Sequence, residues 1–351
     1  MKVRPIDCIE RHILGFLEGK ISELDPLYIP PYTYFQGRNL DRENYVYLVA
    51  SQTDNLAEPV AGCASAIKTY FREDARPLRK VLIDRLVMSP DAPPEEVFTA
   101  IMTYMTEFSA NFILEANIFS EIQSPLFFPT TLSKEGSYIP PQYTPLFEEE
   151  GFTPVKTQYC YTLHPAPTPI PNSHPHPHQP SLHMRPMNIT DEKDRSIYAS
   201  IWNKSTYNMF QTFDISTFFL HSWTIPTNLL MIQDSILFAE ENGKVKGIIE
   251  WKPNLHTLIQ KDPQKYFAPE ESARSTLNLI DEAKICKCVT VNDREDILEQ
   301  MITQTLTLLT TTYHMKTCQI GNIDRDDTLL RGIIEKMGER CATITYMRRG
   351  S

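Results

Sequence analysis

One segment near the middle of the chain, residues 164–183, constrains the fold more than any other. It reads HPAPTPIPNSHPHPHQPSLH, is dominated by proline and histidine, and has no apolar periodicity. Because proline lacks a backbone N–H and fixes φ, such a segment is excluded from helix interiors and central strands. We expect an extended, polyproline-like spacer. The segment therefore predicts two domains, at residues 1–163 and 184–351, joined by a linker.

The linker also carries an HPHPH motif whose side chains, His174, His176 and His178, have the chemistry to bind a transition metal. Ligands in an extended spacer are not held in place before the metal arrives, so we favour a plain spacer over a metal site. Cys286 and Cys288 present the same alternatives. Without a second Cys or His pair we favour ordinary packing, and we expect no metal cofactor.

Composition limits the function classes. The chain has 351 residues, enough for two domains. Its net charge is −10 with no Lys/Arg block, which argues against nucleic-acid binding. The first residues alternate charged and apolar, and no run of about 18 apolar residues occurs, so we expect neither secretion nor a membrane span. Seven scattered cysteines indicate reduced thiols and a cytoplasmic location.

The first half of the chain shows a clear order of elements. A helix is predicted at 8–24, followed by strands rich in β-branched and aromatic residues at 45–51, 60–70 and 81–88. The helix after them has one apolar face, formed by Val97, Ile101, Met105 and Phe108.

The second half repeats this order. Strands are predicted at 235–239, 244–251 and 283–291, then a helix through Tyr313, a strand at 316–320, a helix at 328–336 and a terminal strand, ATITYMRR. We expect Gly338 to end the last helix as a C-cap. Each half also begins with an Arg-Pro pair, which is a hint of duplication.

Four stretches carry a resemblance to a known superfamily. They are LVMSPD and LFEEEGF in the first half, and FAEENGKVKGIIEW and IIEKMG in the second. With the order of elements, they resemble the acyl-CoA N-acyltransferase superfamily, known as GNAT. Three further stretches, IYASIWNKSTYNMF, WKPNLHTLI and FFPTTLSKEGSYIPPQYTPLFEEEGF, resemble a group of bacterial tandem GNAT-like proteins. The resemblance covers nearly all of both halves except the linker.

The resemblance implies a fold and a reaction. The expected fold class is α/β (α+β), with two tandem GNAT-like domains, each a mixed, mostly antiparallel sheet flanked by helices. The implied reaction transfers an acyl group from acetyl-CoA or another acyl-CoA to an amine of a small molecule or peptide. In the superfamily the fourth strand splays open at its end to admit the acyl group, and the pyrophosphate rests on a glycine-rich loop at a helix N-terminus.

The resemblance also assigns candidate residues. Those expected to contact the cofactor are Val87 and Met88 in the first half and Thr290, Val291, Asn292 and Asp327 in the second. Two strand carboxylates, Asp84 and Glu250, are the candidate catalytic bases, with a structural ion pair as the alternative for each.

The sequence departs from the superfamily at several points. The loops SPDAPPEEVF and VNDREDILEQ contain no glycine, and the chain has only 12, where average usage would give roughly 25. Pro93 and Pro94 lack an N–H, and acidic residues stand where a pyrophosphate would rest. The tyrosine that usually returns a proton to the CoA thiolate is replaced by Phe147 and Ile334.

Two hypotheses therefore stay open. One is a divergent N-acyltransferase that binds CoA through backbone contacts and uses water as its proton donor. The other is a non-catalytic GNAT-like module that binds a small molecule, a peptide or a protein. If one half is a scaffold and the other carries the activity, we favour the second half, because proline does not block its turn at Asn292. The acceptor and the oligomeric state stay undetermined at this level.

Overall fold

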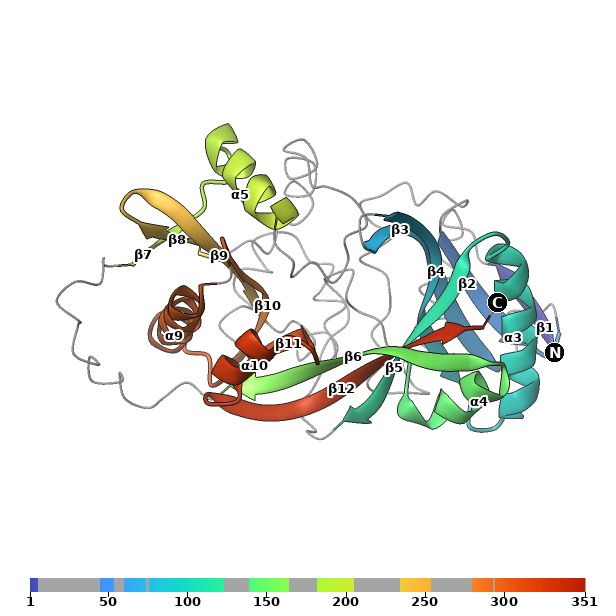
Figure 1. Cartoon of the computed structure of the whole chain (residues 1–351). Coiled ribbons are helices and arrows are strands. Elements are labelled where there is room, and N and C mark those ends of the chain that lie inside the picture. The colour runs from blue at the N-terminus through green and yellow to red at the C-terminus, as the bar shows by residue number, and fades with distance from the viewer. Residues whose placement is uncertain are drawn as a thin grey trace. The chain divides into compact units, whose positions relative to one another are not determined.

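The computed structural model describes residues 1–5, 45–53, 60–73, 76–122, 139–163, 182–204, 234–253, 280–292 and 294–350 (Figure 1). Linker residues 164–181 and the helix predicted at 8–24 lie outside these ranges. The contacts divide the chain into two compact units. Unit 1 comprises Met1–Thr157 and Ala342–Ser351, and unit 2 comprises Gln158–Phe210 and Asp214–Cys341. The domain boundaries at the linker stay a prediction, and the compact units differ from them in the last strand of each half.

Unit 1 is a sheet with its helices. Its strands are β1 (Lys2–Pro5), β2 (Tyr45–Ser51), β3 (Gly62–Glu73), β4 (Arg76–Met88), β5 (Ile113–Ile122) and the end of β12 (Gly338–Arg349). Neighbouring strands are antiparallel except β4 and β5, which are parallel. The helices are α3 (Pro94–Phe108), the 3-10 helix η1 (Pro141–Tyr143) and α4 (Thr144–Glu149). The three strands predicted for this half are confirmed, with β4 beginning earlier than expected.

Unit 2 repeats the pattern. Its strands are β7 (His183–Pro186), β8 (Ile236–Glu241), β9 (Lys244–Pro253), β10 (Glu282–Thr290), β11 (Thr317–Asp324) and the end of β6 (Phe152–Leu163). Here β10 and β11 are the parallel pair. The helices are α5 (Glu192–Lys204), α9 (Glu295–Thr311) and α10 (Thr328–Ile334). The predicted hairpin between β8 and β9 is confirmed, with Asn242 and Gly243 at φ 53° and 71°.

The described strands follow one hydrogen-bonded order, β1-β2-β3-β4-β5-β12-β6-β11-β10-β9-β8-β7. The α/β class with mixed, mostly antiparallel pairing agrees with the expectation. The expectation of a separate sheet in each half is not met. The reason is an exchange of strands. β12, the last strand of the second half, pairs with β5 of the first half, and β6, the last strand of the first half, pairs with β11 of the second.

The two halves are structural repeats. Both Arg-Pro pairs lie in edge strands, since β1 pairs only with β2 and β7 only with β8 among the described strands. Met88 pairs with Gly62 at the end of β4, as Thr290 pairs with Gly247 at the end of β10. Four residues before these ends, both strands carry a β-bulge, which is an extra residue in one strand of a pair. The duplication hinted at by the sequence is therefore present in the pairing.

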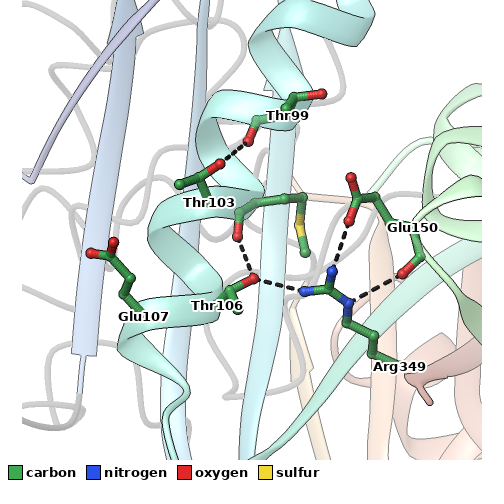
Figure 2. Close-up of a pocket in the computed structure, with 7 residues that line it drawn as sticks. Thr99, Thr103, Thr106, Glu107, Glu150 and Arg349 are labelled. Carbon is green, nitrogen blue, oxygen red and sulfur yellow. Dashed lines mark hydrogen bonds and ion pairs between the residues drawn. The ribbon is translucent and has the colours of Figure 1, made fainter. Parts of the chain in front are cut away.

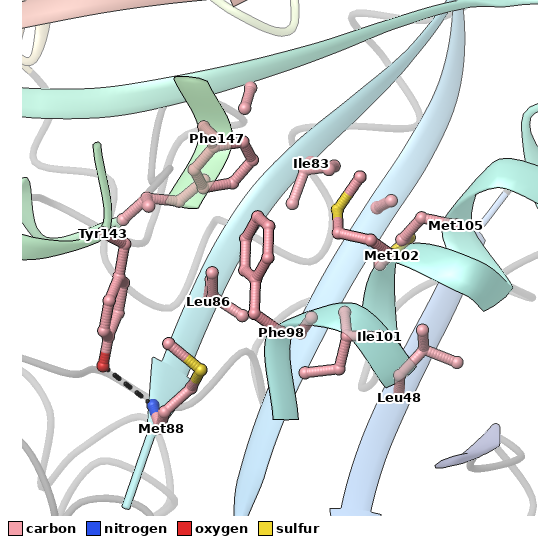
Figure 3. Packing of buried hydrophobic residues seen from close by; sticks show 14 of the residues in the cluster. Leu48, Ile83, Leu86, Met88, Phe98, Ile101, Met102, Met105, Tyr143 and Phe147 are labelled. Carbon is pink, nitrogen blue, oxygen red and sulfur yellow. Dashed lines mark hydrogen bonds between the residues drawn. The ribbon is translucent and has the colours of Figure 1, made fainter. Parts of the chain in front are cut away.

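Helix α3 holds the core of unit 1 together (Figure 3). As predicted, Val97, Ile101 and Met105 are buried, while Phe108 is only partly buried at the edge of the cluster. Phe147 packs edge-on against Phe98, with ring centroids 4.9 Å apart. This packing fixes α4 against α3 and so sets the position of the residues just before α4.

The expectation that Gly338 ends helix α10 as a left-handed C-cap is wrong. Gly338 begins β12, and among the described glycines those at positive φ are Gly151, after α4, and Gly243. Position 338 requires glycine because the backbone packs closely there. A Cβ at this position would lie 2.3 Å from the carbonyl oxygen of Thr162.

We expect Gly338→Ala to lower the free energy of unfolding by about 1–3 kcal/mol, because the backbone of β6 must move to admit the methyl group. Gly332→Ala is the matched control. Gly332 lies in α10, and a Cβ at this position would have nothing within 4 Å of it, so alanine there should stabilise by about 0.4–1 kcal/mol. Urea unfolding of both variants checks the prediction, and equal effects would contradict it.

Candidate functional site

Each unit contains a parallel strand pair that stops pairing before its strands end. In unit 1, pairing of β4 with β5 ends at Ile83 and Ala116, although β4 continues to Met88. In unit 2, pairing of β10 with β11 ends at Ile285 and Ile320, although both strands continue. We call these openings wedge 1 and wedge 2. Backbone groups on the facing edges of a wedge are not used by the parallel ladder, so their hydrogen bonds must go to other groups.

Wedge 1 holds the predicted residues Val87 and Met88, both buried. The Met88 N–H donates a hydrogen bond of 2.9 Å to the hydroxyl of Tyr143 (Figure 3). On the other strand, the Phe119 N–H donates to the carbonyl oxygen of Ile139 at 3.0 Å. Part of the chain just before α4 therefore bonds to both edges of this wedge.

The predicted residues Thr290, Val291 and Asn292 form the turn from β10 into α9. The hydroxyl of Thr290 accepts a 2.9 Å hydrogen bond from the Arg294 N–H, and the Val291 N–H donates to the carbonyl oxygen of Lys246 at 2.7 Å. Asn292 is exposed and has a left-handed φ of 65°. The structure thus brings these three residues together with Arg294, which the sequence did not single out.

Arg294 precedes the first turn of α9 and bonds to the carboxylate of Asp296, with Nε 2.7 Å from Oδ1. Arg294 also lies 3.4 Å from Glu241. The pKa of Asp296 lies below its ordinary value, because Arg294 donates to it and because backbone N–H groups of Asp296 and Ile297 point at it. The Asp296 carboxylate therefore already interacts with the positive end of the α9 helix dipole.

Glu250 lies in β9 with its side chain 4% exposed. Its Oε2 accepts a 3.0 Å hydrogen bond from the hydroxyl of Tyr198, and its Oε1 lies 3.2 Å from Nζ of Lys252. Burial alone would raise the pKa of this carboxyl, but the charges of Lys252 and Lys287 outweigh it, and the pKa is lowered. The arrangement is a buried charge cluster that keeps Glu250 ionised.

Asp84 is the extra residue of the β4 bulge, because the pairing shifts from Ala66–Ile83 to Ser65–Arg85. Its side chain lies outside the described part of the structure. At the corresponding bulge of β10 the residue is Cys286, so the second repeat has no carboxylate at this position.

Asp327 is the N-cap of α10. Its carboxylate accepts a 2.9 Å hydrogen bond from the Leu330 N–H. Burial raises the pKa of Asp327 above its ordinary value. The geometry is that of a helix cap, and contact with a cofactor stays a proposal for this residue.

A shallow groove of about 330 Å³ lies on unit 1 (Figure 2). At one end, the Arg349 guanidinium binds three groups: the Thr106 hydroxyl at 2.7 Å, and the carboxylate and carbonyl oxygen of Glu150 at 2.9 and 3.2 Å. The hydroxyl of Thr103 is bonded to the carbonyl oxygen of Thr99. These polar groups already bond to one another. Their hydrogen bonds connect β12 to α3 and to the end of α4.

Two negative findings concern only the described residues. No three His, Cys, Asp or Glu side chains among them are grouped so that they could hold a metal ion. None of the described helices combines the length and apolar character needed to cross a membrane.

Comparison with solved structures identifies the fold. A GCN5-related N-acetyltransferase from Sphaerobacter thermophilus superposes with a TM-score of 0.58 at 11% identity, over 99% of this chain and 94% of that one. A tandem GNAT protein from the clavulanic acid biosynthesis pathway gives 0.60 at 10% identity, over 99% and 97%. The chain has the GNAT fold.

Saccharomyces cerevisiae N-myristoyltransferase with bound myristoyl-CoA is a further match, with a TM-score of 0.55 at 11% identity, over 99% of this chain and 78% of that one. No protein-family model matches the sequence, and no curated protein matches it in sequence. At 10–11% identity the likeness establishes the fold, and activity must be argued from the site.

An acyl-CoA would meet two different environments in the GNAT fold of unit 2. At wedge 2 the facing edges of β10 and β11 are not paired with each other, so an acyl arm could bond to their backbone groups. The start of α9 fits the pyrophosphate poorly, because the Asp296 carboxylate, paired with Arg294, lies in its first turn. A second anion at this position would also be repelled by the carboxylate.

Sequence reasoning missed Tyr143 and Arg294. Tyr143 lies four residues, one helical turn, before Phe147, the position assigned to the lost tyrosine. That spacing was the available signal, since residues four apart share a helix face. For Arg294, the signal was a single basic residue among the acidic residues of NDRED.

Proposed function

We propose that the chain is a divergent N-acyltransferase and that unit 2 carries the activity. The observation that supports this most is wedge 2, where two parallel strands of unit 2 stop pairing; the resemblance to the superfamily implies that the acyl group is admitted there. Because the first turn of α9 carries the Asp296 carboxylate, paired with Arg294, the donor is held mainly by its acyl arm and only weakly by its pyrophosphate.

The proposed roles follow from the contacts. A bound acyl-CoA would supply the acyl group as a thioester. Thr290 and Asn292 shape the turn beside wedge 2, and Glu250 is the proposed base because its carboxylate is ionised, although its lowered pKa makes it a weak base.

A second candidate, a non-catalytic binding module, is favoured by one specific observation. The place of the proton-donating tyrosine is taken in α10 by Ile334, and the residue one turn earlier is Leu330. Neither can return a proton to a leaving thiolate, so any transfer in unit 2 needs a water for this step.

Titration calorimetry with acetyl-CoA and with acetyl-pantetheine, which lacks the nucleotide and its pyrophosphate, tests the proposal. We expect both to bind, with affinities within about tenfold of each other, because the pyrophosphate adds little. If neither probe gives a heat of binding while a melting transition shows that the protein is folded, then donor binding is overturned. The non-catalytic binding module is then the remaining candidate.

Asn292→Val should weaken binding of both probes at least tenfold, because a β-branched residue strains a left-handed φ and displaces the turn. Asn111→Val is the matched control. Asn111 has a φ of 69° and is also exposed, but it lies in unit 1, before β5. Equal losses in the two variants would contradict the assignment to unit 2.

A further inference from the structure

Wedge 1 contains a segment of the protein's own chain, Ile139–Tyr143, which we call the plug. At one end, the Ile139 carbonyl oxygen accepts from the Phe119 N–H on β5, and at the other, the Tyr143 hydroxyl accepts from the Met88 N–H on β4. The two bonds reach the two strands that have stopped pairing with each other. The plug therefore satisfies backbone donors on both edges of the wedge.

The plug is built as a fixed part of the core. Ile139 is 0% exposed and Tyr143 is 8% exposed, and both belong to the hydrophobic cluster around α3. Pro140 and Pro141 between them restrict the backbone, which lowers the entropy lost on ordering the segment. Releasing the plug would expose this apolar surface and leave the Met88 and Phe119 N–H groups to find new partners, a combination that opposes opening.

Among the described residues, unit 2 has no segment that corresponds to the plug. Phe147 and Ile334 hold the same place in LFEEEG and IIEKMG, so the counterpart of Tyr143 is Leu330, which has no hydroxyl. The chain between β5 and η1 runs over residues 123–140, whereas between β11 and α10 it runs only over 325–327. Three residues suffice for the turn into α10, where Asp327 is the cap, but not for an inserted segment.

We infer that the protein binds a single acyl donor, in wedge 2, and that the plug in wedge 1 takes the place a donor would occupy in the first repeat. This rests on the proposed function for unit 2. The plug presents a carbonyl oxygen and a hydroxyl to the strand N–H groups, which are acceptors of the kind that a thioester carbonyl and the amides of a pantetheine arm would also offer. Unit 1 then contributes packing and the exchanged strand, and takes no part in the acyl transfer.

Hydrogen exchange on the wild-type chain with saturating acetyl-pantetheine gives the first test. We expect slower exchange in the peptides that cover 286–292 and no change in those that cover 85–90 and 117–122. Slowing in the unit 1 peptides, alone or together with unit 2, overturns the single-site inference while leaving donor binding intact. No change anywhere overturns the proposed function and the inference together.

A reciprocal pair of variants gives the second test. Leu330→Tyr, which puts the plug's hydroxyl into the second repeat, should weaken acetyl-pantetheine binding at least tenfold. Tyr143→Leu should leave binding within twofold, with one donor per chain. The opposite pattern, or two donors per wild-type chain, overturns the inference. Leu330 is buried, so Leu330→Phe is the control for the effect of a larger side chain without a hydroxyl. If Leu330→Phe and Leu330→Tyr weaken binding equally, the result also contradicts the inference.

Discussion

A chain that stops after Cys341 is expected to lose the fold of unit 1, although every deleted residue follows the whole of unit 2 in the sequence. The deletion removes the part of β12 that pairs with β5 from Ala342–Ile122 to Arg348–Glu115. It also removes Met347, 1% exposed, from the core around α3. Burial of a single large apolar side chain is worth about 1.5–3 kcal/mol, so the loss of several, with the ladder, is comparable to the whole stability of a domain.

Hydrogen exchange resolved by peptide measures this effect. In the truncated chain, protection should vanish from β4 and β5 while it persists in β9 and β10. A chain that lacks only Gly350 and Ser351 is the control and should keep the wild-type pattern, apart from the contact of the Gly350 N–H with Gly151. Wild-type protection in β5 after truncation would show that β12 is dispensable to unit 1.

The second large effect is expected at Glu250, where Glu250→Gln should cost about 3–5 kcal/mol of unfolding free energy at neutral pH. The carboxylate is buried between Lys252 and the Tyr198 hydroxyl, and removal of one partner leaves a buried charge uncompensated. The folded-state pKa is lowered from 4.5. The stabilisation is therefore complete above about pH 4.5 and is lost progressively as the pH falls below it.

Urea unfolding at several pH values between 3 and 7 tests this. The wild type should lose more stability than Glu250→Gln on acidification, because the variant has no proton to take up at this position. Asp281→Asn removes the same charge from an exposed pair with Lys316, where little change is expected. If the Glu250 variant unfolds like the wild type at every pH, then the lysines do not hold this carboxyl ionised.

Much of the local structure could be predicted from the sequence, because local patterns determine it. The alternation of apolar residues in YVYLVAS and the Asn-Gly turn before Lys244 indicate strands and a hairpin without knowledge of the rest. The candidate residues at the ends of β4 and β10 lie where the strands were expected to stop. Their roles in binding stay predictions.

The pairing of β12 and the plug could not be predicted, because neither is local. The apolar alternation of β12 would suit pairing with β5 or with β11 equally well. The sequence of β12 therefore does not indicate which of the two strands is its partner. The place of Tyr143 depends on how α4 packs against α3 through Phe98 and Phe147. Gly338 was misread for a related reason, since its requirement comes from Thr162, a neighbour distant in sequence.

The strand exchange has a consequence for synthesis on the ribosome. β5 is complete at Ile122, but its partner strand runs to Arg349 and so is translated much later. At about 5–20 residues per second the edge of β5 must wait roughly 10–50 s for this partner. During that time the nascent chain presents an open strand edge of the kind that recruits wrong partners. We expect the newborn protein to depend on chaperones until β12 has emerged from the ribosome.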